Sequence, residues 1–128
     1  MPSPAIRVDA IDLRGRPGDV SRHAPHHGIG YPRHRHDAIE LNVVTGGRGA
    51  YLVGDRRVDL VPGRLLWLFA DEAHHLAAAT RLDYWIVYFD PDLIRRANVH
   101  RPGNGDPLVR DVTVDQCRLL HGICADLL

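Results

Sequence analysis

The sequence lacks any apolar run long enough to cross a membrane. Its longest apolar runs, at 65–70 and 84–89, have the length of strands and fall well short of the roughly 18 residues that a spanning helix needs. The N-terminus also lacks a charged segment followed by an apolar stretch, so we expect no signal peptide. These absences predict a cytoplasmic protein without a membrane partner.

Cysteine is scarce as well. Only Cys117 and Cys124 are present, and both fall in one predicted helix. That spacing separates them by about 10 Å along the helix axis, which exceeds the roughly 7 Å Cα separation that a disulfide allows. We therefore expect two free thiols in the helix core and a reducing compartment.

An excess of charge of either sign is also absent. The 16 basic residues, all of them arginine, balance the 16 acidic residues. The basic footprint of nucleic-acid-binding surfaces is therefore missing from this chain. We treat the absence of lysine as a bias of composition that carries no functional prediction.

The sequence does contain enough apolar material for one folded domain. Its 128 residues and 45% hydrophobic content fit a single core and exclude a disordered chain. Short strand-like segments recur, separated by turn signals rich in Gly, Pro and Asp, as in all-β sandwiches and barrels. The pattern predicts a turn at 14–18, a loop at 21–31, and strands at 5–13, 39–44, 50–53, 57–61, 65–69, 75–78 and 83–89.

The pattern becomes helical after residue 90. Asp90 and Pro91 suit the cap and first turn of a short helix at 92–97. Thr113 and Gln116 have the spacing of a capping box and predict the start of a second helix. The chain is thus divided into a barrel at 1–90, with core strands at about 5–13 and 39–89, and a helical segment at 91–128 that includes a loop at 98–107.

One face of the second predicted helix is apolar, with helical spacing at Cys117, Leu120, Cys124 and Leu127. The stripe runs to Leu128 without a capping residue, so we expect that the natural chain continues or that the stripe packs on a partner. We predict that the stripe forms a homodimer interface. The alternative is a helix that packs back on its own barrel.

Nine histidines are present, and two of them form the arrangement His34-Arg35-His36 shortly before Glu40. On a strand, His34 and His36 point to the same face, where a metal can accept both imidazoles. Glu40 would lie about 13 Å farther along a straight strand. It can therefore reach the same place only if the chain turns a corner near Asp37.

A third imidazole is expected from His74, which follows an apolar strand and a tight turn. Three neutral imidazoles and one carboxylate make an N3O donor set that suits Zn, Fe, Mn, Ni or Cu, and the sequence does not choose among these metals. Two alternatives remain open. The histidines could be exposed residues of a polar loop, or they could hydrogen-bond an organic ligand without a metal.

These residues resemble the first motif of the cupin superfamily. In that motif a Gly, a His-x-His, a Glu and a second Gly have fixed spacings, and the sequence meets each one. The matching residues are Gly28, His34, His36, Glu40 and Gly47.

The segment 62–74 resembles the second cupin motif, which supplies the third histidine. It departs from the pattern because Phe69-Ala70-Asp71 stands in place of Pro-x-Gly, and Ala78 stands in place of an Asn. His75 could substitute for His74, although strand alternation would point it to the opposite face.

The stretch 34–94 resembles the N-terminal sensor domain of AraC-type transcription regulators. In that family a barrel is followed by one or two helices and then by a DNA-binding domain with two helix-turn-helix units. The resemblance implies an all-β fold, a small cupin or jelly-roll β-barrel followed by one or two C-terminal α-helices. It also implies a small-molecule effector, a homodimer, and contact with DNA only through a C-terminal domain beyond Leu128.

The leading hypothesis is a ligand sensor without catalytic residues. Its pocket is expected to contain the four candidate metal ligands His34, His36, Glu40 and His74, together with Trp67. The alternative is a metal-dependent cupin enzyme of the dioxygenase or isomerase type. Asp37 and Glu72 lie near the candidate ligands in sequence but could equally face solvent, so an acid or base is not evident. A storage role is a distant third.

Overall fold

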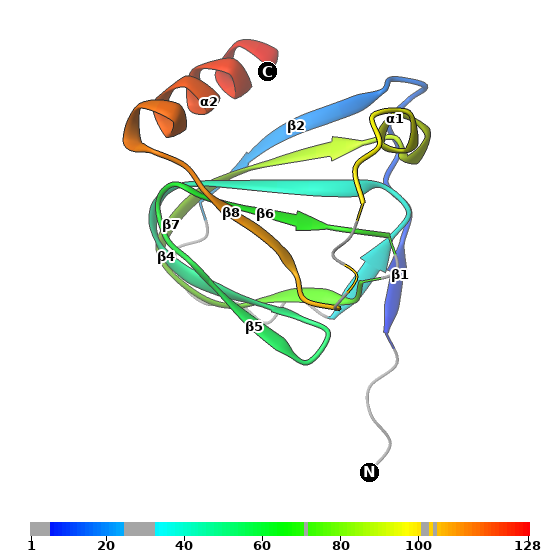
Figure 1. Ribbon diagram of the computed structural model, residues 1–128, viewed down its shortest axis with the longest axis horizontal. Helices are drawn as coiled ribbons and strands as arrows, with labels where there is room; N and C mark the ends of the chain where they lie inside the picture. The colour runs from blue at the N-terminus through cyan, green and yellow to red at the C-terminus, as the bar shows by residue number, and fades with distance from the viewer. Residues whose placement is uncertain (1–5, 25–32, 71, 101–102, 104) are drawn as a thin grey trace.

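Two long strands, β4 (Ile39–Val53) and β7 (His74–Phe89), form the frame of the computed structural model (Figure 1). They pair antiparallel along almost their whole length and curve into a barrel. The structure describes residues 6–24, 33–70, 72–100, 103 and 105–128. The other elements are β1 (Arg7–Asp9), β2 (Gly18–His23), β3 (His34–His36), β5 (Arg56–Leu60), β6 (Arg64–Leu68), α1 (Pro91–Arg96), β8 (Leu108–Asp111) and α2 (Val114–Leu127).

The β4–β7 ribbon bends where glycines interrupt β4. The pairing register shifts at several points between Val44 and Tyr51, as in β-bulges. Gly47 has a φ of +70°, and a Cβ at this position would collide with the Arg81 carbonyl, so glycine is required here. The sequence predicted a turn between two strands at this place. The structure shows one bulged strand, because the glycines bend the ladder without breaking it.

The strands follow the order β1-β3-β7-β4-β6-β8, with β2 added to β7 and β5 added to β4. Two of these strands were missed in the sequence. β2 lies in the predicted turn and loop, and β8 lies in the predicted helical segment, where it pairs with β6. Both strands are short and carry little apolar alternation, so their pairing partners stabilise them more than their own sequences do. The mainly β fold followed by helices is otherwise as predicted.

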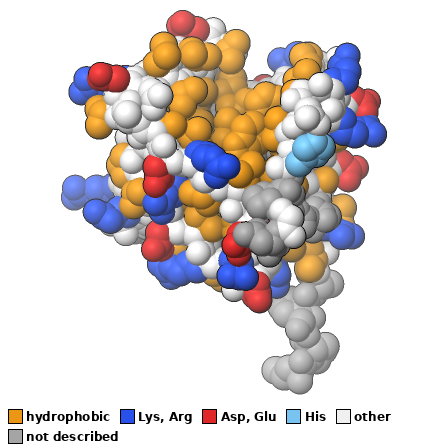
Figure 2. Space-filling model, in the orientation of Figure 1, with side chains coloured by type: hydrophobic (Ala, Val, Ile, Leu, Met, Phe, Trp, Pro, Cys, Tyr) orange, Lys and Arg blue, Asp and Glu red, His pale blue; other side chains and the backbone are white. Residues whose placement is uncertain are grey.

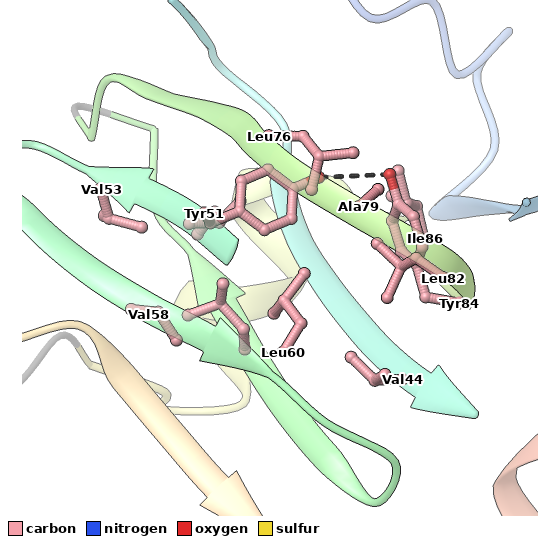
Figure 3. Packing of buried hydrophobic residues seen from close by; sticks show 12 residues of the cluster. Val44, Tyr51, Val53, Val58, Leu60, Leu76, Ala79, Leu82, Tyr84 and Ile86 are labelled. Atoms are coloured by element: carbon pink, nitrogen blue, oxygen red, sulfur yellow. Dashed lines mark hydrogen bonds between the residues drawn. The ribbon is translucent and has the colours of Figure 1, made fainter. Parts of the chain in front are cut away.

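The inner face of the barrel is filled by one apolar cluster (Figure 3). Side chains from β4, β5, β6 and β7 meet there, and the Tyr51 and Tyr84 hydroxyls lie 3.4 Å apart at its centre. This core occupies the part of the barrel beside the histidines. The fully or nearly fully buried members are Val44, Tyr51, Val53, Val58, Leu60, Leu66, Leu68, Leu76, Ala79, Leu82, Tyr84 and Ile86.

The outer face of the same ribbon carries α2. Cys124 of the helix packs with Val20, Val43 and Trp85 of the sheet. The Trp85 Nε1–H donates a hydrogen bond of 2.9 Å to Nδ1 of His121, which attaches the helix to β7. Both cysteines are free, as predicted. In the part of the chain that the structure describes, no helix has the length and apolarity needed to cross a membrane.

Candidate metal centre

Three imidazoles meet at one end of the barrel. His34 and His36 are separated by one residue on β3 and therefore share one face of it. His74 pairs with His34 at the start of β7. One ring nitrogen from each histidine lies within 4.8 Å of the others, a separation that a shared ion can span. The ring centroid of His74 is 4.4 Å from that of His34 and 5.1 Å from that of His36. The two cupin-like segments therefore converge as predicted by their sequence resemblance.

Glu40 joins this group across a corner of the chain. The backbone bends at Asp37 and Ala38, between the end of β3 and the start of β4. His36 stabilises the bend, since its Nδ1 donates to the Ala38 carbonyl at 2.7 Å. Oε1 of Glu40 then lies 3.1 Å from Nε2 of His36 and 3.8 Å from Nε2 of His74. The corner that the motif required is present, and it brings all four candidate ligands together.

The hydrogen bonds of the imidazoles leave their Nε2 atoms facing the group. Nδ1 of His36 donates to the Ala38 carbonyl, and Nδ1 of His74 donates to the Glu72 carbonyl at 2.9 Å. A carbonyl oxygen only accepts, so these bonds place the proton of each neutral ring on Nδ1 and the lone pair on Nε2. Among the described residues, Nε2 of His74 is buried without a hydrogen-bond partner. A lone pair left in this way fits a ligand that supplies a positive charge.

Burial and charge shift the titration of the group in opposite directions. Burial raises the pKa of Glu40, but the hydrogen bond from His36 and the neighbouring imidazole charges outweigh it, and the net pKa is lowered. Burial lowers the pKa of His74 and favours its neutral form. Burial also lowers the pKa of His36, but the hydrogen bond and charge of Glu40 outweigh this effect and raise it. The charged forms of both His36 and Glu40 are thus favoured, at the place where a cation would bind.

Three neighbours of the group were missed in the sequence. Asn42 is completely buried, and its Nδ2 donates to Oε2 of Glu40 at 2.9 Å. The Tyr88 ring lies 5.7 Å from the His36 ring. Asp9 lies opposite His36 in the β1–β3 pairing, and its charge contributes to the raised pKa of His36. Strand alternation could have identified Asn42, because residues 40 and 42 share one face of a strand.

Other predicted site residues lie elsewhere. Trp67 stacks on Phe89 at 5.8 Å between ring centroids, in a cluster with Ile94, so the structure does not bring it to the imidazoles. Asp37 is exposed, and Oε1 of Glu72 accepts a hydrogen bond from the Phe69 amide. Neither carboxylate therefore occupies the position of an acid or base in the group. Gly28 lies outside the described residues.

The predicted dimer stripe is mostly covered within the chain. Cys124 is buried against the barrel, Leu120 packs beside it, and the Cys117 thiol donates to the Val44 carbonyl at 3.5 Å. Leu127 is 65% exposed and borders a hollow of about 280 Å³ between α2 and α1. Figure 2 shows hydrophobic side chains gathered in this hollow. Three of the four residues thus fit the alternative, in which the helix packs back on its own barrel.

Comparison with solved structures supports a cupin fold. An apo form of ToxT from Vibrio cholerae superposes with a TM-score of 0.67 at 8% identity, covering 88% of this chain and 48% of ToxT. A cupin 2 conserved barrel domain protein from Salinispora arenicola gives 0.54 at 19% identity, covering 75% and 76%. A cupin protein from Bacteroides fragilis gives 0.53 at 16% identity, covering 77% and 82%.

The chain spans about half the length of ToxT. A second ToxT structure, with an unsaturated fatty acid bound, superposes with a TM-score of 0.60 at 8% identity, covering 86% of this chain and 46% of ToxT. No curated protein matches the sequence. The sequence does match the AraC-like ligand binding domain family over residues 17–127, which is most of its length. This chain therefore belongs to the AraC-like ligand binding domain family.

Proposed function

We propose that this chain is the sensor domain of an AraC-type transcription regulator, and that a divalent metal ion in its barrel takes part in binding a small-molecule effector. The observation that carries the metal proposal is the convergence of His34, His36 and His74, with ligand nitrogens within 4.8 Å of one another. The unpartnered Nε2 of His74 supports it, because burying a lone pair without a donor or a cation is costly.

The donor set fits a transition metal better than a hard cation. Nε2 of His36 and His74, one ring nitrogen of His34 and Oε1 of Glu40 would hold the ion, and such N3O sites suit Zn, Fe, Mn, Ni or Cu. When bound, the ion would act as a Lewis acid for an oxygen or nitrogen of the effector. The chain's own residues keep the two Nδ1 protons away from the site and bury the carboxylate.

The regulator part of the proposal rests on family membership. ToxT has been solved with an unsaturated fatty acid bound, which supports a small molecule as the effector of this fold. Contact with DNA would be made by a C-terminal domain outside this chain. Such a regulator works beside the DNA, so we propose a cytoplasmic location.

The output would pass through α2. Trp85 lies on the outer face of β7 and is flanked in sequence by Tyr84 and Ile86, which face the core. Its hydrogen bond to His121 joins that strand to the helix. A second apolar stripe of α2 is exposed at Leu119, Ile123 and Leu127, by 64%, 48% and 65%. We propose this outer stripe as the homodimer interface.

Metal loading tests the site directly. The folded protein is dialysed against Zn²⁺ or Co²⁺, and bound metal is measured by elemental analysis, with β content followed by circular dichroism. His34→Ala combined with His36→Ala should abolish uptake and keep the β content. His100→Ala removes an exposed histidine outside the group and serves as the matched control. Full metal occupancy in the double variant would refute the site.

A metal-dependent cupin enzyme is the second candidate, favoured by the three-imidazole, one-carboxylate arrangement. Such an enzyme needs an acid or base besides the metal ligands. Oxygen consumption by Fe²⁺-loaded protein across a panel of small organic acids would separate the two functions. Turnover that disappears in His34→Ala would establish the enzyme, and binding without turnover would favour the sensor.

A further inference from the structure

Asn42 is a buried polar residue whose side chain is only half satisfied. It is 0% exposed, and its Nδ2 donates to Oε2 of Glu40 at 2.9 Å and to the Leu66 carbonyl at 3.4 Å. Among the described residues, its Oδ1 has no hydrogen-bond partner. The amide therefore supplies a donor to the buried carboxylate and to the backbone, while it leaves its own acceptor unpaired.

The amide divides the two oxygens of Glu40 between two tasks. Oε2 is held by Asn42, while Oε1 lies 3.1 Å from Nε2 of His36 and 3.8 Å from Nε2 of His74. Residues 40 and 42 share the inner face of β4, so the strand itself sets this arrangement. The hydrogen bond from Asn42 therefore fixes the rotation of the carboxylate that turns Oε1 toward the imidazoles.

Metal binding would remove the other hydrogen bond that holds Glu40. In the metal-free site, Nε2 of His36 and Oε1 of Glu40 are hydrogen-bonded at 3.1 Å. An ion held by Nε2 of His36 and Oε1 of Glu40 would occupy the lone pairs that take part in this hydrogen bond. The hydrogen bond between the two side chains would therefore be lost. Within the described part of the chain, Asn42 is then the one hydrogen-bond donor left on the carboxylate.

We propose that Asn42 is the positioning residue of the metal centre: it holds Glu40 in the orientation that binds the ion, without contacting the ion itself. This inference rests on the proposed metal centre. Hydrogen-bonding partners of metal ligands typically change metal affinity by about 10- to 100-fold when they are removed. Replacing the amide also leaves Oε2 of the buried carboxylate without this donor, so the metal-free fold should lose stability as well.

The test compares metal affinity with stability in the same variants. Asn42→Leu keeps the approximate volume and removes the donor, and Co²⁺ binding is followed by its d–d absorption in a titration of the whole chain. We expect affinity to fall by about 10- to 100-fold, together with a lower melting temperature of the metal-free protein, because Oε2 of Glu40 loses its donor. Asn42→Val is a smaller apolar replacement that repeats the measurement if leucine does not fit.

Two controls separate positioning from a general effect on the fold. Val44 lies on the same face of β4 as Asn42. Val44→Ala should lower the melting temperature without changing Co²⁺ affinity. In a Glu40→Gln background, Asn42→Leu should cause no further loss, because Asn42 acts through the carboxylate. Equal Co²⁺ affinity in wild type and Asn42→Leu, or an undiminished loss in the Glu40→Gln background, would overturn the inference alone. A wild-type chain that binds no Co²⁺ would overturn the proposed metal centre and the inference together.

Discussion

The polar groups around Glu40 and those under α2 differ in how well they are satisfied. On the inner face of the β4–β7 ribbon, the group around Glu40 leaves Asn42 Oδ1 and His74 Nε2 buried without partners in the described residues. On the outer face, under α2, the buried Trp85 Nε1–H finds its acceptor in His121. Polar satisfaction is what a stable interior requires. The satisfied contact under α2 therefore has the character of a structural joint, whereas the unsatisfied group around Glu40 has that of a binding site.

The largest loss of stability should come from removing the Trp85 side chain, which packs under α2 on the outer face. Trp85 is 1% exposed and is the largest side chain in the cluster that seats α2. Trp85→Ala should lower the free energy of unfolding by about 3–5 kcal/mol, the usual cost of a large-to-small change at a buried aromatic position. Urea unfolding measures this loss. Co²⁺ affinity of the folded fraction should be unchanged, and a large loss of affinity would show that the two faces are not separate.

A smaller loss is expected when only the hydrogen bond of the joint is removed. His121→Leu leaves the Trp85 Nε1–H buried without an acceptor, which should cost about 1–3 kcal/mol of unfolding free energy. His121→Gln retains an acceptor and is the matched control. Trp85 fluorescence in a Trp67→Phe background reports whether the indole becomes exposed. Equal stability of the leucine and glutamine variants would mean that the bond contributes little to seating α2.

The titratable groups on the inner face should make the metal-free protein less stable both at lower and at higher pH. The pKa of His36 is raised in the folded state. The stability that this shift contributes is therefore lost as the pH rises from about 6.5 through the pKa of the folded protein. The pKa of His74 is lowered, so stability falls as the pH drops below about 6.5, where the unfolded imidazole takes up a proton. The lowered pKa of Glu40 adds to this acid loss below its ordinary range.

Stability should therefore pass through a maximum near pH 6.5, with slopes of at most about 1.4 kcal/mol per pH unit for each proton. Urea unfolding at intervals between pH 4 and 8.5 measures the curve. His36→Leu should flatten the alkaline side and keep the acid loss that comes from His74. A wild-type curve that rises steadily from pH 6.5 to 8 would contradict the raised pKa of His36 beside Glu40.

Local sequence signals predicted the meeting of the candidate ligands better than they predicted the elements that cover the barrel. The spacing of His34, His36 and Glu40 required a corner, and the backbone bends at that place. Alternation and turn residues also indicated most strands, because the buried positions follow the period of two along β5 and β6. Such features depend on neighbours in sequence and can be read from it.

The features that the sequence missed depend on distant partners. β8 pairs with β6 and is anchored by two hydrogen bonds between Arg64 and Asp111, of 2.8 and 3.1 Å, which no local pattern could show. The apolar stripe of α2 was identified, but its spacing could not decide between a partner and the chain's own barrel. Val43 and Trp85 form an apolar surface on the outer face of the barrel, and α2 packs on it.

The smallest effect on stability should come from the exposed stripe of α2. Ile123 is 48% exposed, so Ile123→Glu should change the free energy of unfolding by no more than about 0.5 kcal/mol, as is usual for surface substitutions. If Leu119, Ile123 and Leu127 form the homodimer interface, the buried charge should shift the protein toward monomer in sizing chromatography and sedimentation. Asp126→Glu, on the same helix, conserves the charge and is the control. A dimer that persists in Ile123→Glu would remove the outer stripe from the interface and direct attention to another surface.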